Sequence, residues 1–137
     1  MRTIKNLTTT LMAGLMATFM FAALASAAMV EVKAKDGIGQ YLSDDKGMTL
    51  YMFKKDAPGK SVCLATTGCL EKWPAYYVDK VETSGGVSPD AFATITRDDG
   101  KKQTTFKGLP LYYFFKDKAP GDTNGQGFND VWYVVAP

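Results

Sequence analysis

Two aspartates hold matching places in a pattern that the chain contains twice. Gly47 to Asp56 reads Gly-x-x-Leu-Tyr-x-Phe-x-x-Asp, Gly108 to Asp117 repeats it, and a Pro-Gly pair follows each copy. Two carboxylates facing each other across a cleft would be the machinery of a glycosidase. An aspartate that ends a strand before Pro-Gly is more often a turn residue, whose carboxylate accepts backbone N–H bonds from its own turn. The pattern therefore predicts a structural role for Asp56 and Asp117.

The chain has two cysteines, Cys63 and Cys69. In an oxidising compartment this pair predicts a disulfide across a short local loop. A thiol-redox pair is the alternative, although redox catalysts typically use Cys-x-x-Cys in an α/β setting and neither is present. A metal site would need ligands besides two thiolates, and none stands at metal-ligand spacing. The pair is expected to stabilise the fold.

No histidine occurs anywhere in the chain. A serine or cysteine nucleophile would therefore lack its usual base, and the commonest metal ligand and near-neutral pH switch are missing too. Gly125-x-Gly127 follows no strand-to-helix pattern and is too weak a signal for a phosphate loop. The composition predicts a protein that is not an enzyme and needs no cofactor.

Oxygen ligands and glycines gather in the loop after the second copy of the pattern. Asp117, Asp122, Asn124 and Asp130 make this loop a weak candidate for calcium. A calcium loop of this type needs a bidentate acid six positions after its glycine, and Tyr133 stands there instead. Turn formation by Asp, Asn and Gly explains the same residues. No metal is expected, and calcium remains an alternative.

Aromatic residues crowd both copies of the pattern. The residues expected to pack in the core of a small β domain are Tyr51, Phe53, Tyr112 and Phe114. Such rings could instead stack on a sugar or a partner. Because side chains alternate along a strand, Tyr113 and Phe115 point to the opposite face and would form an exposed patch if that face is wet.

Alternating apolar residues and turn signals predict strands through most of the chain. The expected strands span residues 30–34, 39–43, 50–53, 91–96, 103–107, 111–114 and 131–135. Pro74 stops a short helix or turn between them. The fold predicted is all-β, a compact antiparallel sandwich or partly open barrel built from two related β-repeats. The division expected is a single domain over 28–137, with repeat units 30–82 and 90–137 and a linker at 83–89.

Residues 1–27 have the features of a secretory signal peptide. Arg2 and Lys5 precede an apolar run from Leu11 to Leu24, and small residues at Ala25 to Ala27 offer a cleavage site. The run is short for a bilayer span, so no membrane span is expected after processing. Removing Arg2 and Lys5 from the 16 basic residues leaves them equal to the 14 acidic ones. A chain without net charge has no evident affinity for nucleic acid.

The repeated pattern resembles a bacterial family of secreted repeats and predicted lipoproteins named for a Tyr-x-(Phe/Trp/Tyr)-x-x-Asp motif, whose function is unassigned. The residues that match the motif are Tyr51, Phe53 and Asp56, then Tyr112, Phe114 and Asp117. The resemblance extends to Cys63, Cys69, Trp73-Pro74, Gly121-Asp122, Gly125-Gln126-Gly127 and Trp132. Many relatives look like lipoproteins with a cysteine at the cleavage point, whereas this chain has none before Cys63.

These observations predict an exported, soluble, non-enzymatic β-repeat protein of the cell envelope, periplasmic or secreted. It would bind a small ligand or an envelope partner, or serve a structural role. A periplasmic thiol-redox protein using Cys63 and Cys69 and a calcium-stabilised binding module are the alternatives.

Overall fold

The structure, a computed structural model, describes Gly14 and residues 27–137. The strands are β1 (Ala28–Lys35), β2 (Gly39–Ser43), β3 (Tyr51–Phe53), β4 (Val81–Thr83), β5 (Phe92–Thr96), β6 (Lys102–Phe106), β7 (Leu109–Pro110) and β8 (Trp132–Val134). The helices are η1 (Ala65–Thr67), α1 (Cys69–Lys72) and η2 (Pro89–Ala91). The predicted signal peptide, residues 1–27, lies outside the described residues except for Gly14 and Ala27. No helix in the described part of the chain is long and apolar enough to cross a membrane.

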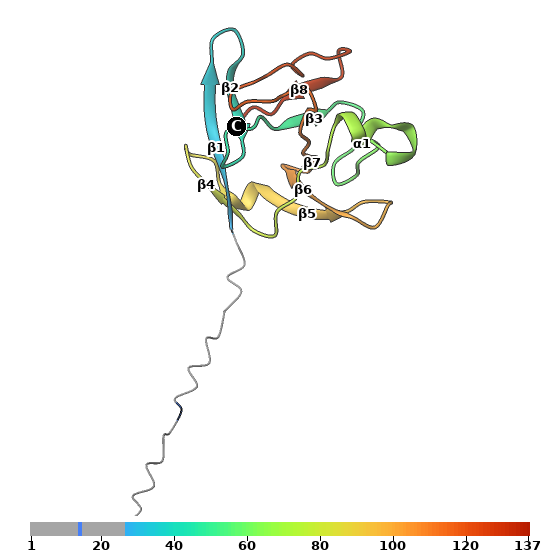
Figure 1. Cartoon of the computed structure of the whole chain (residues 1–137), viewed down its shortest axis with the longest axis horizontal. Coiled ribbons are helices and arrows are strands. Elements are labelled where there is room, and N and C mark those ends of the chain that lie inside the picture. The colour runs from blue at the N-terminus through green and yellow to red at the C-terminus, as the bar shows by residue number, and fades with distance from the viewer. Residues whose placement is uncertain (1–13, 15–26) are drawn as a thin grey trace, which may run out of the picture.

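The β1–β2 hairpin opens the domain and forms one side of it (Figure 1). Its strands pair antiparallel, from Glu31 opposite Ser43 to Lys35 opposite Gly39. The alternation of apolar and charged residues along β1 places Val30 in the core and leaves the charged side chains outside. On its other edge β1 pairs with β4 in parallel. This parallel pair is an exception to the antiparallel pairing that the sequence predicts.

The second repeat builds an equivalent hairpin from β5 and β6. Phe92 lies opposite Phe106 and Thr96 opposite Lys102, and β6 then turns tightly into β7. Gly108 in that turn has φ +83°, a conformation that glycine adopts without strain. In Figure 1, β5 lies along the lower margin of the domain.

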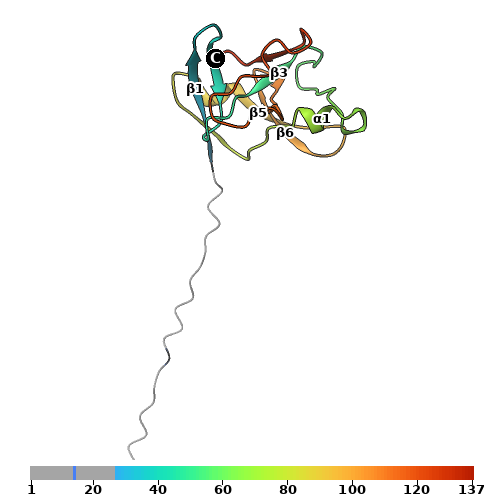
Figure 2. The ribbon, with the colours of Figure 1, turned by 45° about the horizontal axis from the view of Figure 1, so that its top comes forward.

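The two repeats exchange strands. β3 of the first repeat pairs antiparallel with β8, which ends the second repeat. In return, residues 72–76 of the first repeat pair with the second copy of the pattern. The N–H of Tyr76 donates to the carbonyl of Leu111 and the N–H of Phe115 to that of Lys72, both at 2.9 Å. Figure 2 shows β3 beside the red C-terminal segment. Each repeat therefore completes the sheet of the other.

Two apolar clusters fill the interior. The first is made of Val30, Leu42, Leu50, Tyr76, Phe106, Leu111 and Val135. The second contains the motif rings and is made of Tyr51, Cys63, Trp73, Tyr112, Phe114 and Trp132. Both clusters draw residues from both repeats, so neither half of the chain encloses a core of its own.

The predicted all-β class with two related repeats is confirmed. The strands form three small sheets, and none of them closes into a barrel among residues 27–137. The exchange of strands between the repeats is not predicted by the sequence.

Candidate functional site

Each motif tyrosine is hydrogen-bonded to the aspartate of the other copy. Tyr51 Oη donates to Asp117 Oδ2 at 2.5 Å, and Tyr112 Oη donates to Asp56 Oδ2 at 2.6 Å. This crossing follows from the strand exchange, because the two tyrosines also exchange backbone N–H···O bonds of 2.8 and 3.0 Å. A hydrogen bond to an ionised carboxylate is stronger than one between neutral groups. The motif ties the repeats together.

The second oxygen of each aspartate accepts a backbone N–H from its own exit loop. Asp56 Oδ1 accepts from Val62 at 2.7 Å, and Asp117 Oδ1 accepts from Asn124 at 3.0 Å. These are the turn bonds that the sequence predicts. Burial raises the pKa of both carboxyl groups above the ordinary aspartate value, while the hydrogen bonds lower it. Each carboxylate thus uses both oxygens within the fold.

Four rings stack where the repeats meet. Phe53 stacks on Trp132 with ring centroids 4.2 Å apart, Trp132 on Trp73 at 3.8 Å, and Trp73 on Phe114 at 4.2 Å. Successive rings come from alternate repeats, so the stack is shared equally between them. An aromatic pair contributes about 0.5–1.5 kcal/mol beyond its buried area. The stack therefore adds apolar cohesion to the Tyr–Asp hydrogen bonds.

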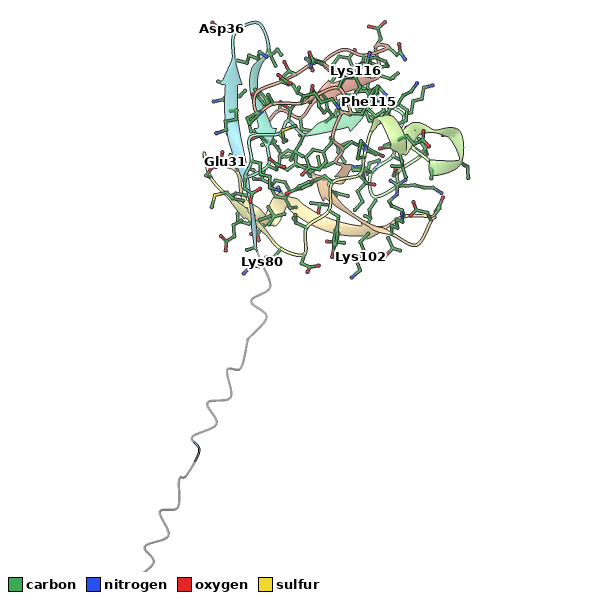
Figure 3. The ribbon with its side chains drawn as sticks, in the orientation of Figure 1. Glu31, Asp36, Lys80, Lys102, Phe115 and Lys116 are labelled. Carbon is green, nitrogen blue, oxygen red and sulfur yellow. A yellow bond between two sulfur atoms is a disulfide. The ribbon has the colours of Figure 1, made fainter. Side chains whose placement is uncertain are left out.

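The opposite face of the second pattern is only partly exposed. Tyr113 is half-buried, and its hydroxyl donates to Asp44 Oδ2 at 2.8 Å. Phe115 is 40 % exposed, and the ammonium of Lys116 lies 5.7 Å from its ring centroid (Figure 3). Of these two aromatic residues, Phe115 alone is exposed.

A buried arginine connects to the pair formed by Tyr112 and Asp56. Arg97, only 5 % exposed, follows β5, and its Nη1 donates to Ser61 Oγ and Gln103 Oε1, both at 2.6 Å. Its Nη2 donates to the carbonyl of Cys63, and its Nε donates to Asp99 Oδ2 at 3.3 Å. A guanidinium suits this place because its donors form a rigid planar fork.

The hydrogen bonds from Arg97 to Asp56 run in one direction. Tyr112 Oη has a single hydrogen, which it donates to Asp56, so Ser61 must donate in the 2.5 Å contact between the two hydroxyls. Ser61 in turn accepts from Arg97. The chain therefore begins at a cation and ends at an anion, an order in which each bond polarises the next.

The predicted disulfide between Cys63 and Cys69 is confirmed. Cys63 is buried beside the aromatic cluster, and Cys69 begins α1. The carbonyl of Cys63 accepts a hydrogen bond from Arg97. Arg97 therefore contacts both the disulfide loop and the hydrogen-bond chain that leads to Asp56. The loop is therefore closed by a disulfide and also hydrogen-bonded to Arg97.

The loop after the second pattern is held by turn bonds. Asp122 Oδ2 accepts from the N–H groups of Lys118 and Ala119 at 2.9 and 3.0 Å. Asn124 Nδ2 donates to the Lys116 carbonyl at 3.3 Å, and Asp130 stands at φ +58°. Among the described residues, no three His, Cys, Asp or Glu side chains gather where they could hold a metal ion. These contacts are those of the predicted turn chemistry.

Two of the surface hollows lie beside β5. One of about 220 Å³ lies between β5 and residues 78–81, with Phe92 and Thr94 in its wall. Another of about 120 Å³ reaches Ser61 and Arg97. No motif tyrosine or aspartate lines either hollow. Of the motif's polar residues, Tyr51, Tyr112 and Asp117 are buried and Asp56 is half-buried.

The model of the Lipoprotein_15 family, described as a secreted repeat of unknown function, matches residues 32–76 and 93–136. The chain belongs to this family. The two matches correspond to the two repeats that exchange strands. No curated protein and no solved structure matches the chain.

The polar network of Arg97, Ser61 and Gln103 in this secreted-repeat protein is not predicted from the sequence. One signal was available: Arg97 is the only arginine after the leader, where every other basic residue is lysine. A single arginine in such a setting suggests a place that needs the planar fork. Ser61 and Gln103 carry no comparable signal.

Proposed function

We propose that this secreted-repeat protein is a non-enzymatic binding or structural module of the cell envelope, soluble after export. One observation carries the proposal. Tyr51, Tyr112 and Asp117 are buried and Asp56 is half-buried, and the hydroxyl and carboxylate groups are hydrogen-bonded to each other across the repeats. These groups are engaged in stabilising the fold and are not free to act on a substrate.

The remaining chemistry of the chain supports the same reading. No histidine is present to act as a base, and Ser61 is buried with its hydroxyl donating to Tyr112. Large apolar side chains reach the surface at Val62, Tyr77 and Phe115. Exposed aromatic residues on a rigid scaffold are a common means of recognition.

Photo-cross-linking in the exporting cell tests the proposal. A photoreactive amino acid replaces Tyr77 or Phe115, one at a time. A binding module gives a defined cross-linked product from at least one position, and an excess of purified wild-type domain suppresses it. A Tyr112→Phe background serves as the control, because a motif that only holds the fold leaves the yield unchanged at temperatures where the variant is folded. No product from either position contradicts the binding role and leaves only the structural one. A folded Tyr112→Phe variant without product contradicts the purely structural role of the motif.

The thiol-redox alternative makes a different prediction for the same assay. Replacing Cys63 and Cys69 together by serine removes any dithiol chemistry and costs about 2 kcal/mol of stability in the chain-entropy model. A binding module retains its cross-linked product below the lowered melting temperature. A redox protein loses it while still folded. For the calcium alternative, the melting temperature would rise with added calcium, and an Asp122→Ala variant would lose that rise.

A further inference from the structure

Among the described strands, none pairs with the outer edge of β5. On the inner side, the backbone of Thr104 in β6 points away from β5, because its N–H donates to Tyr76 and its carbonyl accepts from Leu111. Thr94, directly opposite Thr104, therefore belongs to a non-hydrogen-bonded pair. In such a pair the N–H and C=O of Thr94 point outward from the sheet. The N–H and C=O groups of Thr94 thus lie at the middle of a strand edge that is available for hydrogen bonding.

The same alternation extends along the strand. Phe92 and Thr96, two residues to either side of Thr94, also direct their N–H and C=O groups outward. At the end of η2, the N–H of Phe92 donates to the carbonyl of Pro89. Within residues 27–137, no hydrogen bond reaches the N–H and C=O groups of Thr94 and Thr96 or the C=O group of Phe92. Ala93, Thr94 and Thr96 are exposed, and β5 contains no proline or charged residue. Proteins normally protect an open edge with such residues, so an uncovered one is a template for another strand.

The two faces of β5 differ in charge, which determines the side chains that a strand binding to this edge would need. Phe92, Thr94 and Thr96 share a face with their partners on β6, so Lys102 lies on that face. The hollow of about 220 Å³ opens there, with Lys80 and Asp79 in its wall. The Asp79 carboxylate already accepts a hydrogen bond from the Tyr77 hydroxyl, whereas Lys80 is not paired with an acid among the described residues. Lys80 and Lys102 both project from the lower margin of the domain (Figure 3). Neither lysine forms an ion pair with another described residue.

The other face of β5 is apolar. It carries Ala93 and Ile95, the first exposed and the second half-buried. A strand added to the edge would place alternate side chains beside the two lysines and the others beside Ala93 and Ile95. Acidic residues fit the first positions and β-branched apolar residues the second.

We propose that β5 binds an extended segment of an envelope polypeptide in which acidic and β-branched residues alternate. The segment would add a strand by backbone hydrogen bonds, with side chains providing specificity. The proposal rests on the binding role stated above and names its partner. A second copy of the chain fits less well, because two-fold pairing about Thr94 sets Asp90 opposite Asp98 of the other copy.

A capped, fluorescently labelled heptapeptide alternating glutamate with valine is the probe. Its anisotropy should rise saturably with the purified protein, and hydrogen exchange should slow at the N–H of Thr94 and Thr96. Thr94→Pro removes an outward N–H without breaking the β5–β6 ladder, and is expected to weaken binding about tenfold or more. Thr94→Val, which keeps the N–H, is the matched control and should bind like the wild type.

Charge reversal provides a second test that does not depend on the proline variant folding. Lys80→Glu with Lys102→Glu should abolish binding of the glutamate peptide and permit binding of a peptide alternating lysine with valine. Lys116→Glu, on the opposite margin in Figure 3, should change neither. The proposal is overturned if no binding occurs at millimolar peptide, if Thr94→Pro binds normally while folded, or if the protein forms a dimer that Thr94→Pro dissociates. Cross-linked products from Tyr77 or Phe115 would then leave the broader binding role standing.

Discussion

The hydroxyl of Tyr51 donates a 2.5 Å hydrogen bond to Asp117, 66 residues further along the chain. Tyr112 makes the equivalent bond back to Asp56 across 56 residues. A motif that is contiguous in the sequence is therefore completed only between its two copies. Because each repeat supplies the acceptor for the other's tyrosine, the halves should unfold together in one cooperative transition.

Buried tyrosines should make the protein unfold cooperatively in alkali. Burial raises the pKa of Tyr51, Tyr76, Tyr112 and Tyr113 above the ordinary value of about 10. Above that pH the unfolded chain loses these protons while the folded chain keeps them, so stability falls as pH rises. Each tyrosine contributes up to about 1.4 kcal/mol per pH unit. The tyrosinate absorbance of these four residues should rise in one step together with the loss of the circular dichroism signal. A gradual rise for all seven tyrosines in protein that is still folded would contradict this account.

Replacing Arg97 by lysine should destabilise the domain although the charge is kept. A single ammonium cannot reach the four acceptors on Ser61, Gln103, Cys63 and Asp99. The expected loss is about 3 kcal/mol in the free energy of unfolding, measured by urea denaturation.

Lys60→Met provides the matched control for Arg97→Lys. The ammonium of Lys60 lies 3.9 Å from Asp98, and both side chains are exposed. The free energy of unfolding should therefore change by no more than about 0.5 kcal/mol. Equal effects of the two substitutions would show that the buried network contributes no more than a surface ion pair.

The two motif glycines should differ in their tolerance of alanine. Gly47 and Gly108 have φ of +81° and +83°, so each alanine costs about 1 kcal/mol in backbone strain. Each glycine also faces the proline of the other repeat. A Cβ on Gly47 would lie 2.9 Å from Pro120 Cβ, whereas one on Gly108 would lie 3.4 Å from Pro58 Cβ. Gly47→Ala should therefore lower the melting temperature more than Gly108→Ala, and the reverse order would contradict the packing described.

Local features of this fold could be predicted from the sequence. The strands β1 and β2 follow from their residue pattern, and Asp36-Gly37 marks the turn at which β1 ends. The disulfide follows from two exported cysteines with no other partner. The turn bonds of Asp56 and Asp117 follow from their place before Pro-Gly.

Long-range pairing could not be predicted in the same way. The period of a strand says which residues share a face, and it does not say which strand lies beside it. β3 could pair within its own repeat or with β8, and the sequence of Tyr51 to Phe53 is compatible with both. The acceptors of Arg97 come from separate segments that only the exchanged fold brings together.

A pair of double-mutant cycles tests the exchanged motif most directly. The free energy of unfolding is measured by urea denaturation for Tyr51→Phe, Asp117→Ala and Asp56→Ala, and for the doubles that combine Tyr51→Phe with each aspartate change. The reciprocal contact predicts a coupling energy of about 1–2 kcal/mol between Tyr51 and Asp117. Tyr51 and Asp56, which lie in the same copy of the motif without a hydrogen bond between their side chains, should be additive within about 0.5 kcal/mol. A coupling between Tyr51 and Asp56 that equals or exceeds the one between Tyr51 and Asp117 would show that each motif closes on itself, and would contradict the exchange.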